Sequence, residues 1–116
     1  MLLPSLLVAA QLFVMNSDPA RDHMDIRVEE TRRTARTSFV RINVMKVGAS
    51  VGSSMFVYGA LLRLARQRHF PYFVKTAERD LEFGRLSEME IRFYRRKPNL
   101  PDVFDVNRAC SVMRCD

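Results

Sequence analysis

The hydrophobic and polar positions of the chain follow a helical period in one stretch, residues 53–74, which read SSMFVYGALLRLARQRHFPYFV. Apolar residues recur there at the spacing of one helix face; this stripe consists of Val57, Tyr58, Leu61, Leu62, Leu64 and Ala65. Pro71 cannot continue a helix, so we expect the helix to end shortly before it. Residues 72–74 are apolar on both faces and predict a short buried strand.

Three other stretches alternate apolar and polar residues, as half-buried strands do, namely residues 26–30, 39–47 and 89–95. The polar residues 31–37 separate the first two strands by a short connection, which predicts a hairpin. Residues 77–86 are highly charged and contain Gly84, so this stretch predicts a loop.

The end of the domain carries the signals of a second helix. Pro98 and Pro101 bracket a turn, and Asp102 or Asp105 can cap the helix that follows. Its expected buried face consists of Val106, Ala109, Cys110 and Met113.

The predicted order of elements is β-β-α-β-β-α. Because the helices separate pairs of strands, this order predicts an α+β fold. We expect a two-layer sandwich in which an antiparallel sheet of about four strands carries two helices on one face. Residues 26–116 would form this single domain, preceded by an apolar segment over residues 1–17 and a linker over residues 18–25.

The first fifteen residues, MLLPSLLVAAQLFVM, carry no charge. A membrane-spanning helix needs about 20 apolar residues, so we expect no transmembrane span here. The segment is more typical of a secretory signal, although no Lys or Arg precedes its apolar core. The alternative is a buried first strand or helix of the domain. Val8-Ala9-Ala10 also looks like the start of a lipoprotein processing box, but Gln11 stands where that box requires the lipidated Cys.

The formal net charge is +6 and the isoelectric point is near 10.0. A basic balance favours polyanionic partners such as nucleic acid, but the basic residues are mostly scattered along the chain. The candidate binding surface is the outer face of the predicted sheet, where basic and aromatic side chains could hold a single strand. It comprises Arg41, Arg92, Tyr94, Arg95 and Arg96.

The sequence contains few groups for catalysis or metal binding. Cys110 and Cys115 lie five residues apart, a spacing that favours free thiols; a disulfide between them would require the helix to end. His23 and His69 have no Cys or His at ligand spacing around them. No nucleophile elbow or HExxH motif is present. We therefore expect no catalytic activity, no metal site and no cofactor.

Residues 39–113 resemble a group of small bacterial envelope proteins, many of them lipoproteins, whose biochemical function is not established. The resemblance rests on four segments, LLRLA at 61–65, YFV at 72–74, MEIR at 89–92 and Asp105-Val106. Two departures are Gln11, in place of the lipidated Cys, and His69-Phe70-Pro71, where these proteins usually have a glycine. The resemblance implies a location and a fold, without an activity.

These observations together predict a non-catalytic structural or interaction domain of the periplasm or cell envelope, with an unknown protein or envelope component as partner. The alternative is a basic cytoplasmic domain that binds nucleic acid. An exposed sheet edge would also permit a homodimer.

Overall fold

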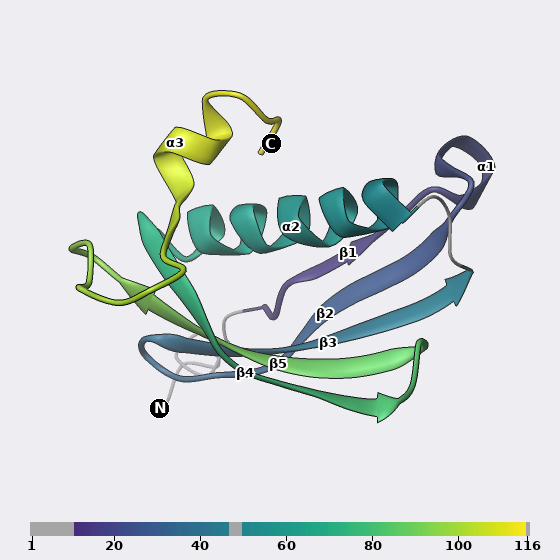
Figure 1. Ribbon diagram of the computed structural model, residues 1–116, viewed down its shortest axis with the longest axis horizontal. Coiled ribbons are helices and arrows are strands. Elements are labelled where there is room, and N and C mark those ends of the chain that lie inside the picture. Colours follow the sequence, from purple (N-terminus) through teal and green to yellow (C-terminus); the bar gives the residue numbers. More distant parts are fainter. Residues whose placement is uncertain (1–10, 47–49, 116) are drawn as a thin grey trace, which may run out of the picture.

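The computed structural model describes residues 11–46 and 50–115, which form a six-stranded antiparallel sheet and three helices (Figure 1). The elements in chain order are β1 (Val14–Asn16), α1 (Pro19–Asp22), β2 (Asp25–Arg33), β3 (Thr37–Lys46), α2 (Ser50–Gln67), β4 (Tyr72–Glu82), β5 (Leu86–Tyr94), β6 (Phe104–Asp105) and α3 (Val106–Cys110). Across the sheet the strand order is β1-β2-β3-β5-β4-β6.

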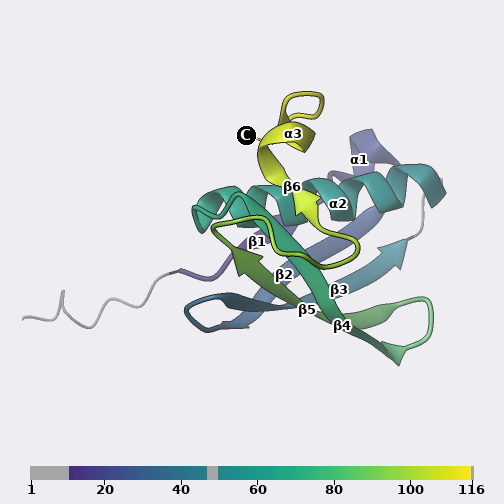
Figure 2. The ribbon, with the colours of Figure 1, turned by 60° about the vertical axis from the view of Figure 1, so that its left-hand side comes forward.

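Two long hairpins build the centre of the sheet. In β2–β3, Val28 pairs with Ile42, and in β4–β5, Phe73 pairs with Phe93. Helix α2 carries the chain from β3 to β4, and β5 then returns between those two strands. The sheet curls into a half-barrel around α2, as the two views in Figures 1 and 2 show.

The hydrophobic core lies between the concave face of the sheet and α2. Alternate residues of the strands point toward the helix, and the core cluster includes Ile26, Val28, Val40, Ile42, Phe73, Met89, Ile91 and Phe93. The helix contributes Leu61, Leu64 and Ala65 from the predicted apolar stripe. The stripe predicted from the sequence therefore does face the sheet.

The predicted fold class is wrong. The fold is mostly β, with six strands instead of about four, and only α2 among the helices is longer than five residues. The predicted loop at residues 77–86 is instead the outer half of the β4–β5 hairpin. Helix α3 does not join α2 on the sheet; it lies on the side of α2 that faces away from the sheet (Figures 1 and 2).

The N-terminal part of the described chain belongs to the sheet. β1 pairs with β2, and Met15 packs against the core. The segment predicted as a linker, residues 18–25, holds α1 and the first residue of β2. The predicted signal-like run lies mostly in residues 1–10, outside the described residues. Within residues 11–46 and 50–115, no helix is both long and apolar enough to cross a membrane.

The cysteines form a disulfide, which corrects the prediction of free thiols. α3 ends at Cys110, and the turn after it brings Cys115 back until the two Cα atoms lie 5.6 Å apart. The condition noted from the sequence, that the helix must end between the two cysteines, is therefore met. Cys115 is buried and belongs to the core cluster.

Candidate functional site

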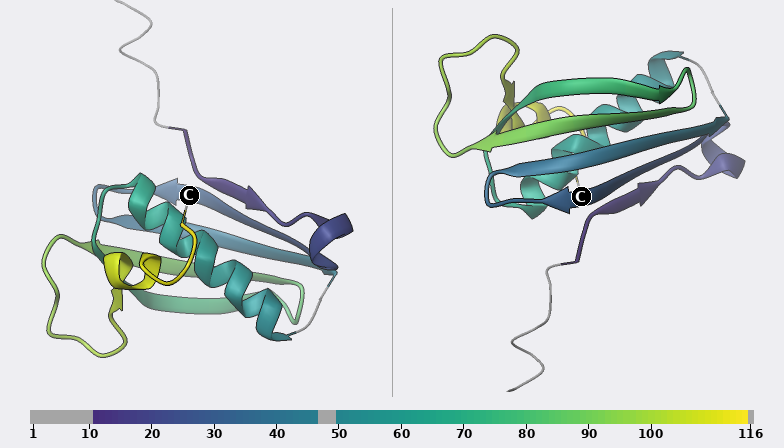
Figure 3. Two further views of the ribbon diagram at one scale, coloured as in Figure 1. Left: turned by 90° about the horizontal axis from the view of Figure 1, so that it is seen from above. Right: turned by 90° about the horizontal axis from the view of Figure 1, so that it is seen from below.

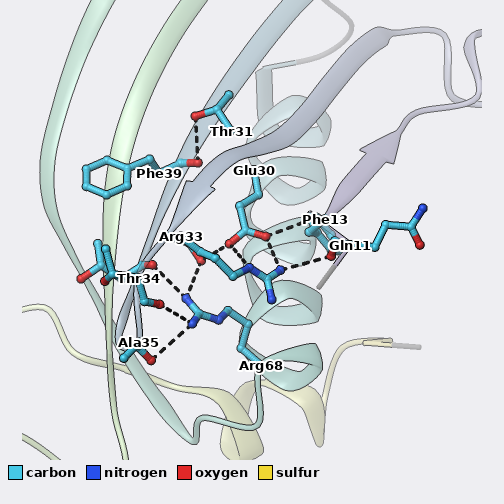
Figure 4. Close-up of polar contacts among 11 residues, drawn as sticks. Gln11, Phe13, Glu30, Thr31, Arg33, Thr34, Ala35, Phe39 and Arg68 are labelled. Carbon is cyan, nitrogen blue, oxygen red and sulfur yellow. Dashed lines mark hydrogen bonds and ion pairs between the residues drawn. The ribbon is translucent and has the colours of Figure 1, made fainter. Parts of the chain in front are cut away.

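A buried carboxylate, Glu30, lies near the C-terminal end of α2 (Figure 4). Its side chain has no exposed surface. Four donors reach its two oxygens. Arg33 donates from Nε at 3.0 Å and also from Nη2, Ser38 Oγ donates at 2.5 Å, and the backbone N–H of Phe13 donates at 3.1 Å. We call Glu30, Arg33, Ser38 and Arg68 the Glu30 cluster.

Arg68 connects this cluster to the helix. Its guanidinium donates to Ser38 Oγ at 3.0 Å and to the carbonyls of Thr37 and Thr34 at 2.9 and 2.6 Å. Because Thr34 and Thr37 flank the β2–β3 turn, Arg68 ties the end of α2 to that hairpin. Arg33 also donates to the carbonyl of Gln11 at 3.4 Å, which holds the N-terminal segment to the same cluster.

The electrostatics of the Glu30 cluster favour the charged form of Glu30. Burial alone would raise the pKa of the Glu30 carboxyl, but the hydrogen bonds from Arg33, Ser38 and Phe13, with the charge of Arg33, outweigh it and lower the pKa. Burial and the neighbouring charge of Arg33 lower the pKa of Arg68. A carboxylate with four donors has no free position for a substrate, so we assign this cluster to structure.

The N-terminal half of α2 lies over a cleft of about 390 Å³, which we call the α2 cleft. Helix α2, all four long strands and β6 contribute to its lining. The apolar lining residues are Ile26, Ile42, Val44, Val57, Leu61, Phe73, Met89 and Phe104; the polar ones are Ser53, Ser54, Tyr58, Lys75, Glu78 and Ser87. An apolar cavity of this size with a few polar groups is the usual form of a small-molecule site.

Aromatic rings form one wall of the α2 cleft. The Phe104 ring stacks on Phe73 with centroids 4.8 Å apart and tilts against Tyr58 at 5.4 Å. The three rings come from β6, β4 and α2. Their mutual packing fixes this wall before any ligand binds, so its shape is largely preformed.

An ion pair lies in the lining of the α2 cleft where β4 contributes to it. Lys75 Nζ lies 2.6 Å from Glu78 Oε1, and their side chains are 44% and 42% exposed. Residues three apart on a regular strand point to opposite faces, but β4 is irregular between Lys75 and Ala77. This bulge at Thr76 turns both side chains of the ion pair toward the same face.

The outer face of the sheet carries a second hollow of about 370 Å³. The Arg32 guanidinium lies 4.0 Å above the Phe39 ring there. Two acidic residues, Glu88 and Glu90, line the same hollow. The face therefore mixes both signs of charge.

The predicted binding residues do not converge on this outer hollow. Arg41 donates to Glu88 at 2.9 Å, while Arg79 donates to the other oxygen of Glu88 at 2.8 Å. The hydrogen bond from Arg79 lowers the pKa of the Glu88 carboxyl most, and the hydrogen bond from Arg41 lowers it further. The charge of Arg41 is thus already paired with that of Glu88 on the neighbouring strand β5.

The other predicted residues lie toward the opposite end of β5 and beyond it. Arg92 is exposed, with its guanidinium 5.9 Å from the ring of the half-buried Tyr94, and Arg96 is exposed in the loop that follows. Arg95 instead stacks over the Phe70 ring at 4.7 Å and donates to the His69 carbonyl. The structure therefore does not gather the five predicted residues into one platform.

The described residues offer no cluster of three His, Cys, Asp or Glu side chains that could hold a metal ion. His23 and His69 both sit in left-handed backbone positions, with φ of 57° and 64°. His69 follows the last turn of α2, where a glycine is common.

Sequence reasoning missed both the Glu30 cluster and the α2 cleft. One signal was available for Glu30. It follows Ile26 and Val28 at intervals of two residues, so on a strand its side chain points inward with theirs. No signal located the cleft, because its lining residues come from six separate elements. Comparison of the chain with protein-family models, curated proteins and solved structures gives no match.

Proposed function

We propose that this chain is a non-catalytic binding domain of the cell envelope that holds a small, mainly apolar molecule in the α2 cleft. The observation that carries the proposal is the cleft itself, a preformed apolar hollow under the N-terminal half of α2. Its few hydroxyl groups and one ion pair suit the orientation of a ligand.

The other two candidate sites support binding less well. The Glu30 carboxylate already has four donors, and the charged lining of the outer hollow includes the Arg79–Glu88 ion pair. Nucleic-acid binding by Arg41, Arg92, Tyr94, Arg95 and Arg96 stays a prediction. The acidic neighbours of Arg41 and the position of Arg95 weigh against it.

Two observations and one prediction support a location in the envelope. The N-terminal run is apolar and uncharged, and the resemblance inferred from the sequence after residue 39 predicts the same location. The Cys110–Cys115 disulfide adds structural support, because such bonds persist mainly in oxidising compartments.

A fluorescent apolar probe, N-phenyl-1-naphthylamine, tests the cleft. Ser54 is exposed and lines the cleft, so Ser54→Trp places an indole over the site without filling the core. The neighbouring Met55 is 47% exposed and lies outside the lining, so Met55→Trp is the matched control. We expect at least a tenfold loss of probe affinity in the first variant and wild-type affinity in the second. Equal affinities in both, or no binding by the wild type, would overturn the proposal.

Location is tested by the intact mass of the chain recovered from envelope and cytoplasmic fractions of a bacterial host. We expect an envelope form whose cysteines resist alkylation until a reductant is added. A full-length cytoplasmic chain with two reactive thiols would contradict the envelope part of the proposal.

A further inference from the structure

We propose that the α2 cleft selects a monocarboxylate amphiphile, a molecule with an apolar body and one carboxylate head, and that Lys75 binds the head. This inference rests on the proposed function, because it names the ligand class of the same cleft. Lys75 is the only cation among the described residues that line the cleft.

The position of Lys75 depends on the bulge at Thr76. Lys75 pairs with Ile91 and Glu78 pairs with Met89, and both partners are buried residues that face α2. Without the bulge, one of the two charged side chains would turn to the outer face. A bulge that redirects side chains in this way is typical of strands beside functional sites.

The surroundings of Lys75 combine an apolar lining with one replaceable partner. Val44, Val57 and Phe104 line the same cleft and are only partly buried, so they offer the surface on which an alkyl body would pack. Glu78 is the present partner of Lys75, and its side chain is 42% exposed. A ligand carboxylate could replace Glu78 while Glu78 turns to water, which keeps Lys75 paired in both states.

The charge of the protein favours an anionic head over a cationic one. The net charge of +6 attracts anions from solution. The first turn of α2, residues 50–53, contains no acidic residue that would offset the positive end of the helix dipole. An amine ligand would instead pair with Glu78 and leave Lys75 without a partner.

The experiment compares two ligands that differ only in the head group. Dodecanoic acid and dodecanol each compete with N-phenyl-1-naphthylamine for the full chain, for the Lys75→Met and Glu78→Gln variants, and for Lys97→Met, an exposed lysine outside the cleft. In the wild type we expect the acid to bind at least tenfold more tightly than the alcohol. Lys75→Met should abolish this preference and leave the affinity for the alcohol within twofold, and Lys97→Met should preserve it. Glu78→Gln removes the competing carboxylate and should strengthen acid binding two- to fivefold.

The possible failures are distinguishable. Equal affinities of the wild type for acid and alcohol, or a preference that survives in Lys75→Met, would overturn the inference and leave the proposed apolar site standing. Tighter binding of dodecylamine than of the acid would assign the head group to Glu78 and also overturn it. If the probe binds but none of these ligands displaces it, the inference fails alone. If the probe itself does not bind, the proposed function fails as well.

Discussion

The two ends of helix α2 meet the same sheet in opposite ways. At the C-terminal end, Arg68 and the Glu30 carboxylate fill the space with satisfied polar contacts, and the stacked rings of Phe70 and Phe93 lie beside them. At the N-terminal half, Val57 and Leu61 face a cleft of about 390 Å³. One helix is therefore fixed at one end and borders open space at the other.

The difference shows how a small domain can combine a polar anchor with an apolar cleft. A buried charge network has few acceptable geometries, because each member that loses its partner is costly. Such a network holds the end of α2 in place, whereas the lining of the cleft is mostly apolar. Stability and binding can thus be changed by separate substitutions.

The largest expected effect comes from breaking the anchored end. Glu30→Gln removes the charge that faces the Arg33 guanidinium but keeps the side-chain shape. Because Arg33 is only partly exposed, we expect a loss of roughly 2 to 3 kcal/mol in the free energy of unfolding, measured by urea denaturation. Glu82→Gln is the control, since Glu82 forms only an exposed pair with Arg85, and it should change the free energy by less than about 0.5 kcal/mol. Similar losses in the two variants would refute the anchor.

The pH dependence of the free energy of unfolding tests the same Glu30 anchor, with a smaller expected effect. The pKa of Glu30 is lower in the folded chain than the value of about 4.3 for an unfolded one. Its ionised form therefore stabilises the fold above that pH, and this contribution disappears as the pH falls through the lowered pKa.

Urea midpoints measured from about pH 6 to pH 3 should fall more steeply in the wild type than in Glu30→Gln. Glu88 also has a lowered pKa and contributes with the same sign, but its partners are exposed, so about 1 M salt suppresses its share. Parallel curves at high salt would show that Glu30 is not the responsible group.

The smallest effect concerns the middle of α2, where Gly59 separates the two regions. A methyl group added there would meet Arg63 Nη1 at 3.8 Å and Met113 Cε at 4.0 Å, both ordinary contacts. Gly59→Ala should therefore stabilise the chain by about 0.5 to 1 kcal/mol and leave the probe affinity of the cleft unchanged. Gly84→Ala is the opposite control, because φ of +74° makes that substitution destabilising. Thermal unfolding of the two variants should move in opposite directions.

Much of the central architecture could be predicted from local patterns. The strands near residues 26–30, 39–47 and 89–95 and the long helix lie where periodicity placed them, within a few residues. The outer half of the β4–β5 hairpin was missed because it does not lie against the core. Its charged residues and the bulges at Thr76 and Leu81 remove the alternation that predicts a strand.

The candidate sites were less predictable than the strands. Their residues meet only through the curl of the sheet, which no local pattern encodes. The outer-face residues were chosen for charge and aromatic character, but in the folded sheet Glu88 of β5 pairs with Arg41 of β3. The disulfide depended on where α3 ends, and a helix boundary is the least certain feature of a sequence pattern.

The outer edge of β4 is the place where a second copy of the chain would add to the sheet. Within the part of the chain that the structure describes, β6 pairs only with Tyr72 and Phe73, and no strand pairs with the outer edge of residues 74–82 (Figure 3). In a symmetric antiparallel pair of such edges, opposing side chains share a face, so a pair centred on Glu78 places that carboxylate against its own copy.

A pair centred on Arg79 sets Arg79 against its copy and Glu78 against Asp80. Like charges in these positions, with two bulges in the strand, are the means by which exposed edges avoid growing into fibres. The charged residues that removed the strand pattern from residues 77–82 are therefore the same ones that oppose like charges in these two registers of self-pairing.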